Sequence, residues 1–241
     1  MACPRCRTAA SGGRVSGWRW LLAGIVLVLY VQIGFLAAVL WVGYFNPART
    51  AFMDAGLARL QEKNPEAELR HRWIDYAQIS PHLKRAVIAA EDSRFLEHDG
   101  FDWEGIEKAV EKNLKKGRIV AGGSTISQQL AKNLFLSASR NPLRKVQEAL
   151  ITVMIEQLWS KRRILEVYLN VIEWGNGIYG AEAATRRYFK TGAGQIGPAQ
   201  AAHLAAMIPN PRYYETHRNA RGLLRRQHII AARMGQVSVP R

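Results

Sequence analysis

The longest apolar stretch of the chain runs from Trp20 to Ala48 and contains no charged residue. Gln32 is its one strongly polar side chain before Asn46. About 20 apolar residues in a helix span the hydrocarbon core of a bilayer, and this stretch is longer. Its length also exceeds the apolar region of a cleaved signal peptide, so we predict a retained transmembrane helix over residues 20–45. Aromatic residues near both ends suit the two membrane interfaces: Trp18, Trp20, Tyr30, Trp41, Tyr44 and Phe45.

A polar connector, residues 46–72, follows and is broken by Pro65 after a predicted juxtamembrane helix. Residues 73–80 are β-branched and aromatic, which predicts a short extended segment. From Ser80-Pro81, an N-cap followed by a proline at the first helical position, the pattern becomes helical. The predicted helices cover residues 81–91, 102–114, 124–136, 141–159, 161–174, 179–189 and 197–208, and Pro209 and Pro211 end the last of them. No series of strands could form a large sheet, so we expect a mainly α domain over residues 73–241.

The chain has 241 residues and a formal net charge of +15, which indicates an acidic partner. The candidates are nucleic acid, an anionic membrane surface and a phosphorylated substrate. No nucleic-acid-binding motif is present, and the apolar helix makes nucleic acid an awkward partner.

The short N-terminal tail, residues 1–19, gives the orientation and the redox setting. It is basic and carries no acid, so we expect it to stay in the cytoplasm and the main body to lie outside the inner membrane of a bacterium. Its C-x-x-C pair has no further metal ligand nearby, and we interpret it as two reduced thiols. The residues concerned are Cys3, Arg5, Cys6, Arg7, Arg14 and Arg19.

The segment "AVIAAEDSRFLEHDG" carries the first candidate for chemistry. An apolar helical run ends at Glu91 and Asp92, so Glu91 is expected to be partly buried. Burial raises the pKa of a carboxyl group and allows it to take a proton near neutral pH. An exposed helix-end acid or a cap for the next turn is the alternative, and His98 likewise suits either a base or a structural hydrogen bond.

The segment "GGSTISQQLAKNLFL" is the second candidate. Gly122 and Gly123 allow a ligand to approach the backbone closely, and the helix that follows is expected to offer free N–H groups. Thr125, Gln129 and Lys132 share one helix face, which suits a phosphate or a sugar. A plain amphipathic helix is the alternative.

In the third candidate segment, Arg144 and Glu148 are spaced i, i+4 with Lys145 beside them, which could equally be a surface ion pair. Taken with Glu91, these cations suggest one task. A carboxylate would activate a hydroxyl while cations hold an anionic leaving group such as a pyrophosphate.

Five motifs occur in order between residues 73 and 213: "EDSRFLEHDGFD", "GGSTISQQLAKNLFL", "RKVQEALITVMIE", "KRRILEVYLN" and "AAHLAAMIPNP". In this order they resemble the motifs of the peptidoglycan glycosyltransferases, glycosyltransferase family 51. The resemblance implies a lysozyme-like, mainly α fold and the polymerisation of lipid II on the outer face of the membrane. Gln200 stands where the family usually has an acid, and "YFKTG" departs from the usual Y-F-G-K.

By the same resemblance, Glu91 matches the catalytic base that deprotonates the 4-hydroxyl of the acceptor, and Glu148 matches the glutamate that organises the cations. The implied substrate-binding residues are Asp92, Phe95, His98, Thr125, Gln129, Lys132, Asn133, Arg144 and Lys145. Lys161, Glu166 and Asn170 match a more structural motif. The family implies no tightly bound cofactor and leaves open a divalent metal, Mg²⁺ or Mn²⁺, at the pyrophosphate.

We therefore expect a single-pass inner-membrane enzyme that forms β-1,4 bonds with inversion and releases undecaprenyl pyrophosphate. Its expected partners are lipid II, the undecaprenyl-pyrophosphate-linked glycan, the membrane and other cell-wall synthases. The sequence contains no S-x-x-K motif, so we expect no transpeptidase activity. The alternatives are a membrane-anchored lytic enzyme of lysozyme-like fold and a tethered scaffold without turnover.

Overall fold

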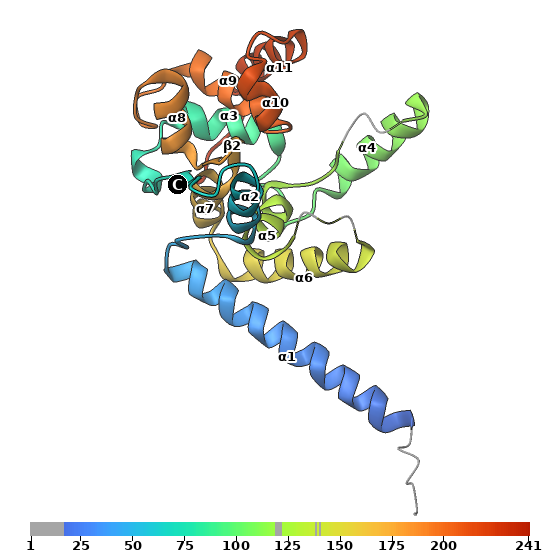
Figure 1. Cartoon of the computed structure of the whole chain (residues 1–241). Helices are drawn as coiled ribbons and strands as arrows, with labels where there is room; N and C mark the ends of the chain where they lie inside the picture. Colours follow the sequence, from blue (N-terminus) through green and yellow to red (C-terminus); the bar gives the residue numbers. More distant parts are fainter. Residues whose placement is uncertain (1–16, 119–121, 138, 140) are drawn as a thin grey trace, which may run out of the picture.

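The computed structural model describes residues 17–118, 122–137, 139 and 141–241 (Figure 1). The predicted cytoplasmic thiols, Cys3 and Cys6, lie outside these residues. Within them, one helix, α1 (Gly17–Tyr44), is long and apolar enough to cross a membrane. It ends just before Asn46-Pro47, because a residue that precedes proline disfavours the helical conformation. The helix matches the predicted span closely, and most of its length extends away from the rest of the chain in Figure 1.

The rest of the described chain is mainly helical, which confirms the predicted fold class. The helices begin where side chains cap them: Ser80 accepts a hydrogen bond from the backbone N–H of His82 at the start of α3, and Asp102 accepts one from Gly105 at the start of α4. The predicted juxtamembrane helix is α2. The bounds are α2 (Ala51–Gln61), α3 (Pro81–Glu91), α4 (Trp103–Lys116), α5 (Ile126–Phe135), α6 (Pro142–Leu158), α7 (Lys161–Val171), α8 (Ala181–Phe189) and α9 (Pro198–Met207).

Two helices at the end of the chain were not predicted. Pro211 does not stop the structure but opens α10 (Pro211–Thr216), because proline is well tolerated at the first position of a helix. α11 (Arg221–Arg233) follows. It buries Leu223 and Ile230, which are two helical turns apart and therefore lie on the same face of the helix. This apolar spacing is a helical signal that the sequence contains.

The described residues include one small sheet, with strand order β1-β3-β2. β1 (Arg70–His71) pairs in parallel with β3 (Ile178–Tyr179), which pairs antiparallel with β2 (Glu173–Gly175). The predicted extended segment 73–80 is wrong in its second half, where η1 (Tyr76–Gln78) is a 3-10 helix. Tertiary contacts decide its shape, because the backbone N–H of Tyr76 donates to Glu166 at 2.7 Å.

The core is organised around α7, in which Ile164, Leu165 and Tyr168 are fully buried. α5 packs against both α7 and α6, while α3 and α11 both pack against α9 and against each other. The C-terminal end of α3 is thereby brought between α5 on one side and α11 on the other. These three helices supply the side chains of the site described below.

α1 is joined to the body through α6 and the start of α7. The Gln32 and Gln147 side chains exchange two hydrogen bonds, at 2.8 and 3.1 Å. The indole N–H of Trp159 donates to the carbonyl of Val39 at 3.0 Å. The strongly polar side chain inside the apolar stretch, Gln32, is partly buried and therefore has a hydrogen-bond partner on α6.

Candidate active site

Glu91 is the last residue of α3, and its side chain is 11% exposed. One carboxylate oxygen accepts a hydrogen bond from the side-chain amide of Gln129 on α5 at 3.0 Å. The other accepts from the guanidinium of Arg226 on α11 at 2.8 Å. The carboxylate is therefore held from both sides by side chains from two other helices, and this orientation leaves lone pairs on each oxygen for a further donor.

Opposing effects act on the Glu91 carboxyl. Burial raises its pKa, and the nearby charge of Asp92 adds to this effect, while the Gln129 hydrogen bond and the Arg226 charge lower the pKa. The side-chain oxygen of Gln129 accepts from the Tyr168 hydroxyl at 2.8 Å, which fixes the amide with its N–H group toward Glu91. Burial raises the pKa of Tyr168 well above its usual value, so this hydroxyl stays protonated and donates. Arg226 and Tyr168 were both missed by the sequence analysis.

Asp92 has a different role from its neighbour. Its side chain is buried, and its two oxygens bind His98 Nε2 at 2.9 Å and the backbone N–H of Ile126 at 3.0 Å. His98 Nδ1 accepts from the backbone N–H of Gly100, so Nε2 carries the hydrogen that Asp92 accepts. Asp92 therefore ties the turn after α3 to the first residue of α5, whose positive helix end favours a carboxylate.

The start of α5 differs from the prediction. Thr125 does not lie on the helix face with Gln129 and Lys132 but caps the helix, accepting from the backbone N–H of Gln128 and donating to the carbonyl of Gly100. Two of the N–H groups expected to be free are thus occupied, one by Asp92 and one by Thr125. At these two positions the helix terminus binds side chains of the protein itself.

Lys132 lies one turn further along α5, partly buried. Within the described chain its ammonium has no hydrogen-bond acceptor, and it lies over the ring of Phe52, whose centroid is 5.4 Å away. Burial lowers its pKa; the charge of Glu148 raises the pKa, Arg144 and Lys145 lower it, and Glu91 raises it. The pKa of Lys132 therefore depends on both the Glu91 carboxylate of α3 and the charged residues of α6.

The charged residues of α6 form one compact group. Arg144 donates to one oxygen of Glu148 at 2.7 Å, and Lys145 donates to the other oxygen. The Glu148 side chain is only 4% exposed, whereas Lys145 is 52% exposed. A buried carboxylate thus orients two cations, and with Lys132 they form what we call the cation cluster: Lys132, Arg144 and Lys145, held by Glu148.

The remaining predicted residues lie around this frame. Phe95 is fully buried, so its ring packs in the core beneath the turn. Asn133 is partly buried next to Lys132 on α5. The fourth-motif residues bind mainly the backbone: Lys161 donates to the carbonyl of His98 at 2.6 Å, Glu166 accepts from Tyr76, and Asn170 binds both the N–H and the carbonyl of Ile74.

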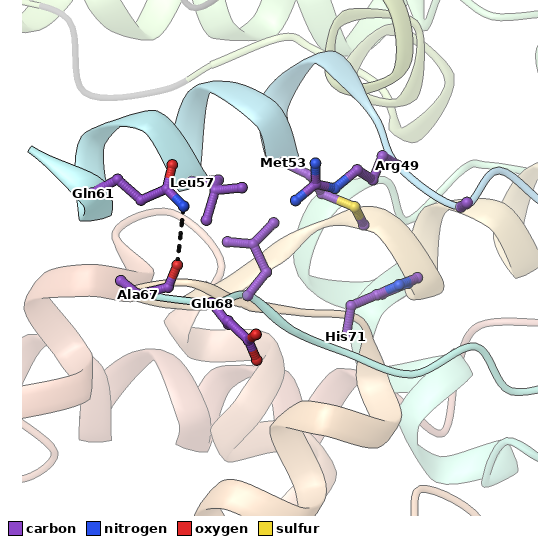
Figure 2. Close-up of a pocket in the computed structure, with 9 residues that line it drawn as sticks. Arg49, Met53, Leu57, Gln61, Ala67, Glu68 and His71 are labelled. Atoms are coloured by element: carbon purple, nitrogen blue, oxygen red, sulfur yellow. Dashed lines mark hydrogen bonds between the residues drawn. The ribbon is translucent and has the colours of Figure 1, made fainter. Parts of the chain in front are cut away.

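Glu91 and Asp92 open onto a small polar cleft of about 120 Å³, which Gly122, Gly123 and Thr125 also line. A larger cavity of about 390 Å³ lies elsewhere, between α2 and the segment that leads into β1 (Figure 2). Figure 2 shows Arg49, Met53 and His71 around it, and none of the predicted site residues lines it. Chemistry and cavity size thus point to different places, and the carboxylate and the cation cluster mark the candidate active site.

The donor set does not fit a metal ion held by the protein. In the part of the chain that the structure describes, no group of three or more His, Cys, Asp or Glu side chains could hold one. Both oxygens of Glu148 are bound by Arg144 and Lys145, and both oxygens of Asp92 are also bound. Among the described residues, the positive charge at this site comes from the cation cluster.

Comparisons with known proteins give the family of the chain. Residues 58–235 match the family model described as transglycosylase, which begins within α2. A biosynthetic peptidoglycan transglycosylase of Thiobacillus denitrificans is 63% identical over 228 residues, covering 93% of this chain and 98% of the relative. Proteins of the same name from Methylobacillus flagellatus and Aromatoleum aromaticum are 61% and 59% identical, covering 92% and 97% of this chain and 97% and 100% of their own lengths. The chain belongs to the transglycosylase family.

Proposed function

We propose that this protein polymerises lipid II into the glycan strands of peptidoglycan by inverting glycosyl transfer. The observation that carries the proposal is the arrangement around α5. Gln129 of this helix holds the buried Glu91 carboxylate, and Lys132, one turn away, leaves its ammonium without an acceptor in the described chain. The residue that holds the proton acceptor and the cation are thus one helical turn apart on α5, and the charge of Glu91 acts on Lys132.

Glu91 acts as the general base. The 4-hydroxyl of the acceptor sugar donates its proton to a carboxylate oxygen of Glu91, while its own oxygen attacks the anomeric carbon of the donor. Burial strengthens the base, and Arg226 keeps it ionised until the proton arrives. A positioned base of this kind accelerates a reaction by about 10²–10⁴-fold.

The cation cluster stabilises the leaving group. As the new bond to the anomeric carbon forms, the bond from this carbon to the undecaprenyl pyrophosphate breaks, and the pyrophosphate takes the electron pair. Attack on an α-linked donor from the opposite face gives a β-1,4 bond. Lys132, Arg144 and Lys145 neutralise the departing charge, so neither a second carboxylic acid nor a metal step is required.

We further propose that α1 anchors the enzyme in the bacterial inner membrane with the catalytic body on the periplasmic face. Both the growing chain and lipid II carry lipid tails, so an enzyme that is fixed at the membrane meets them at their own depth. The basic N-terminal tail supports this orientation.

Product analysis tests the proposed function. The full chain in detergent, incubated with radiolabelled lipid II, is expected to yield glycan polymer that lysozyme digests, together with undecaprenyl pyrophosphate. With mature sacculi as the only substrate it is expected to release nothing. Fragments released from sacculi without polymer formation would support the lytic alternative, and no product from either substrate would support the scaffold.

A further inference from the structure

A second cavity, of about 360 Å³, lies between β1 and α8, on the part of the chain that the catalytic proposal does not use. Its walls are strongly basic, and we call it the basic cleft. It adjoins the cavity of Figure 2, since Leu69 and His71 line both. Ligand sites in proteins have volumes of about 300–1,000 Å³, so the space suits a small ligand. The lining residues that carry positive charge are Arg70, Arg72, Arg186, Arg187 and Lys190.

Two of these five charges are neutralised. Arg186 pairs with the buried Glu182 at 2.6 Å, and Arg187 lies 3.6 Å from Glu215. Arg70, Arg72 and Lys190 form no ion pair with any described residue, and no acid lines this cavity. Burial lowers the pKa of His71, so its ring is neutral near pH 7 and the cleft owes its charge to these three side chains. The cleft therefore carries an excess of positive charge.

The backbone at Lys190 is a second observation on the cleft, independent of its charge. It follows the last residue of α8 and has φ of +59°, the one positive φ of a non-glycine residue in the described chain. Helices that end in this left-handed conformation usually place glycine there, because a side chain costs about 1–2 kcal/mol. A lysine in this position accepts strain and places an ammonium at the wall of the cleft. Strain of this kind at a cavity indicates a functional side chain.

The basic cleft shares no lining residue with the cleft at Glu91. The buried helix α7 contacts both: its Tyr168 hydroxyl reaches Gln129, and its Asn170 carbonyl lies 3.0 Å from His71 Nε2. In Figure 1, α8 lies on the side of the body away from the extended length of α1. An anionic lipid head group would be expected close to α1, so the position favours a ligand that has left the membrane surface.

We propose that the basic cleft binds the carboxylate-bearing peptide stem of the glycan strand. The inference rests on the proposed function, because the product of that reaction carries peptides with free carboxylates. Two guanidinium groups and an ammonium without partners match several carboxylates on one short peptide, and guanidinium pairs with carboxylate in a two-bond geometry. Such a site would hold the strand while its pyrophosphate-linked end stays in the active site.

Lys190 allows a test that separates charge from fold. The probe is fluorescein-labelled tri-glutamate, and its binding to the full chain in detergent is followed by fluorescence anisotropy. Lys190→Gln removes the charge and keeps the strain, and it should weaken binding about threefold. Lys190→Gly also weakens binding but relieves the strain, so it should raise the melting temperature by about 2–4 °C. Lys190→Arg should bind as the unmodified chain does.

The combined variant Arg70→Gln, Arg72→Gln, Lys190→Gln should weaken binding about tenfold or more, since each lost pair contributes separately. Lys112→Gln makes the same charge change at an exposed lysine of α4 that forms no ion pair in the described chain, and it should leave the affinity for the probe unchanged. Inorganic phosphate and phosphatidylglycerol micelles serve as competitors and should displace the probe less well than unlabelled tri-glutamate.

Equal affinity of the combined variant and the unmodified chain would overturn the inference, as would stronger competition by phosphate or by the lipid. Polymerisation of lipid II is measured in the same preparations. If the unmodified chain polymerises but does not bind the probe, the peptide site is wrong and the proposed function stands. If it binds the probe but does not polymerise, the proposed function fails.

Discussion

Replacing Arg226 by glutamine tests how the candidate base is kept ready. The Arg226 guanidinium donates to Glu91 at 2.8 Å and to the carbonyl of Ala90 at 3.2 Å. It therefore places a positive charge beside Glu91 and fixes the position of the end of α3. Arg226→Gln replaces the guanidinium by a shorter side chain with an uncharged amide, which removes the positive charge that lowers the pKa of Glu91. The pKa of Glu91, already raised by burial, should therefore rise further.

The size of this effect follows from the contact. A hydrogen bond to a charged group contributes about 1.5–3 kcal/mol. The Arg226 side chain is 36% exposed, and solvent screening reduces the contribution to about 1–1.5 kcal/mol. About 1.4 kcal/mol corresponds to one pKa unit, so the variant should raise the pKa of Glu91 by about one unit. Glu91 accepts a proton only when ionised, so activity is lost as pH falls through this pKa, and the variant loses it at a higher pH.

The assay is the pH dependence of kcat/KM for lipid II polymerisation. The acid limb of the profile should move upward by about one pH unit in Arg226→Gln. Arg225→Gln is the matched control, because Arg225 is exposed, precedes Arg226 on α11 and forms no ion pair in the described chain. An acid limb that stays in place in Arg226→Gln, or that moves equally in Arg225→Gln, would refute the reasoning.

Three further variants test the residues that hold the site together. Glu148→Gln should lower the free energy of unfolding, measured in urea, by about 1–3 kcal/mol, because Arg144 and Lys145 lose the carboxylate that they share. A loss of stability without a fall in kcat would contradict the role of Glu148 in orienting the cations. Lys132→Met should reduce kcat by about 10²–10³-fold, and the melting temperature should hold or rise because a partly buried ammonium is removed. A fall in melting temperature with unchanged kcat would show that the lysine is purely structural. Gly100→Ala should lower the free energy of unfolding, measured in urea, by about 2–4 kcal/mol, because φ at Gly100 is +95° and the added methyl group would lie 2.8 Å from Thr152. A decrease below about 0.5 kcal/mol would mean that the turn relaxes.

The fold could be predicted in outline because local signals agree with the final structure. An apolar stretch without charges predicts α1, and the Ser80-Pro81 and Asp102 caps mark the starts of α3 and α4. The prediction of an extended segment over 73–80 was wrong in its second half, because α7 holds that part of the backbone through Glu166. No local sequence pattern reveals this contact. The prediction for the end of the chain missed α10, because Pro211 was interpreted as the end of a helix and is in fact the first residue of one.

The candidate site shows the same division. Glu91 and Asp92 are adjacent carboxylates, and sequence alone gives no reason to separate them. In the structure their roles differ. Both oxygens of Asp92 accept hydrogen bonds that hold the turn after α3 to α5, whereas Glu91 accepts from Gln129 and Arg226. Arg226 is 135 residues away from Glu91, so only the packing of α11 beside α3 could identify it.

The resemblance to known glycosyltransferases supplied residues that composition could not. Thr125 fell on a predicted helix face by its spacing, yet it is the cap of that helix, because the chain before Ile126 is extended. Gln129 and Lys132 do share one side of α5, as the helical period predicts. Periodicity therefore placed the interior of the helix correctly and its first turn incorrectly, which is where capping side chains compete with the helix for backbone N–H groups.

The rate of lipid II polymerisation by Glu91→Gln tests the central claim most directly. The variant keeps the shape of the side chain and removes the only function that the proposed reaction asks of it. We expect kcat to fall by about 10²–10⁴-fold, with the melting temperature and the binding of lipid II retained. Glu97→Gln, at an exposed acid after the same turn, should polymerise at the unmodified rate. Polymerisation by Glu91→Gln at a rate close to that of the unmodified chain would contradict the account.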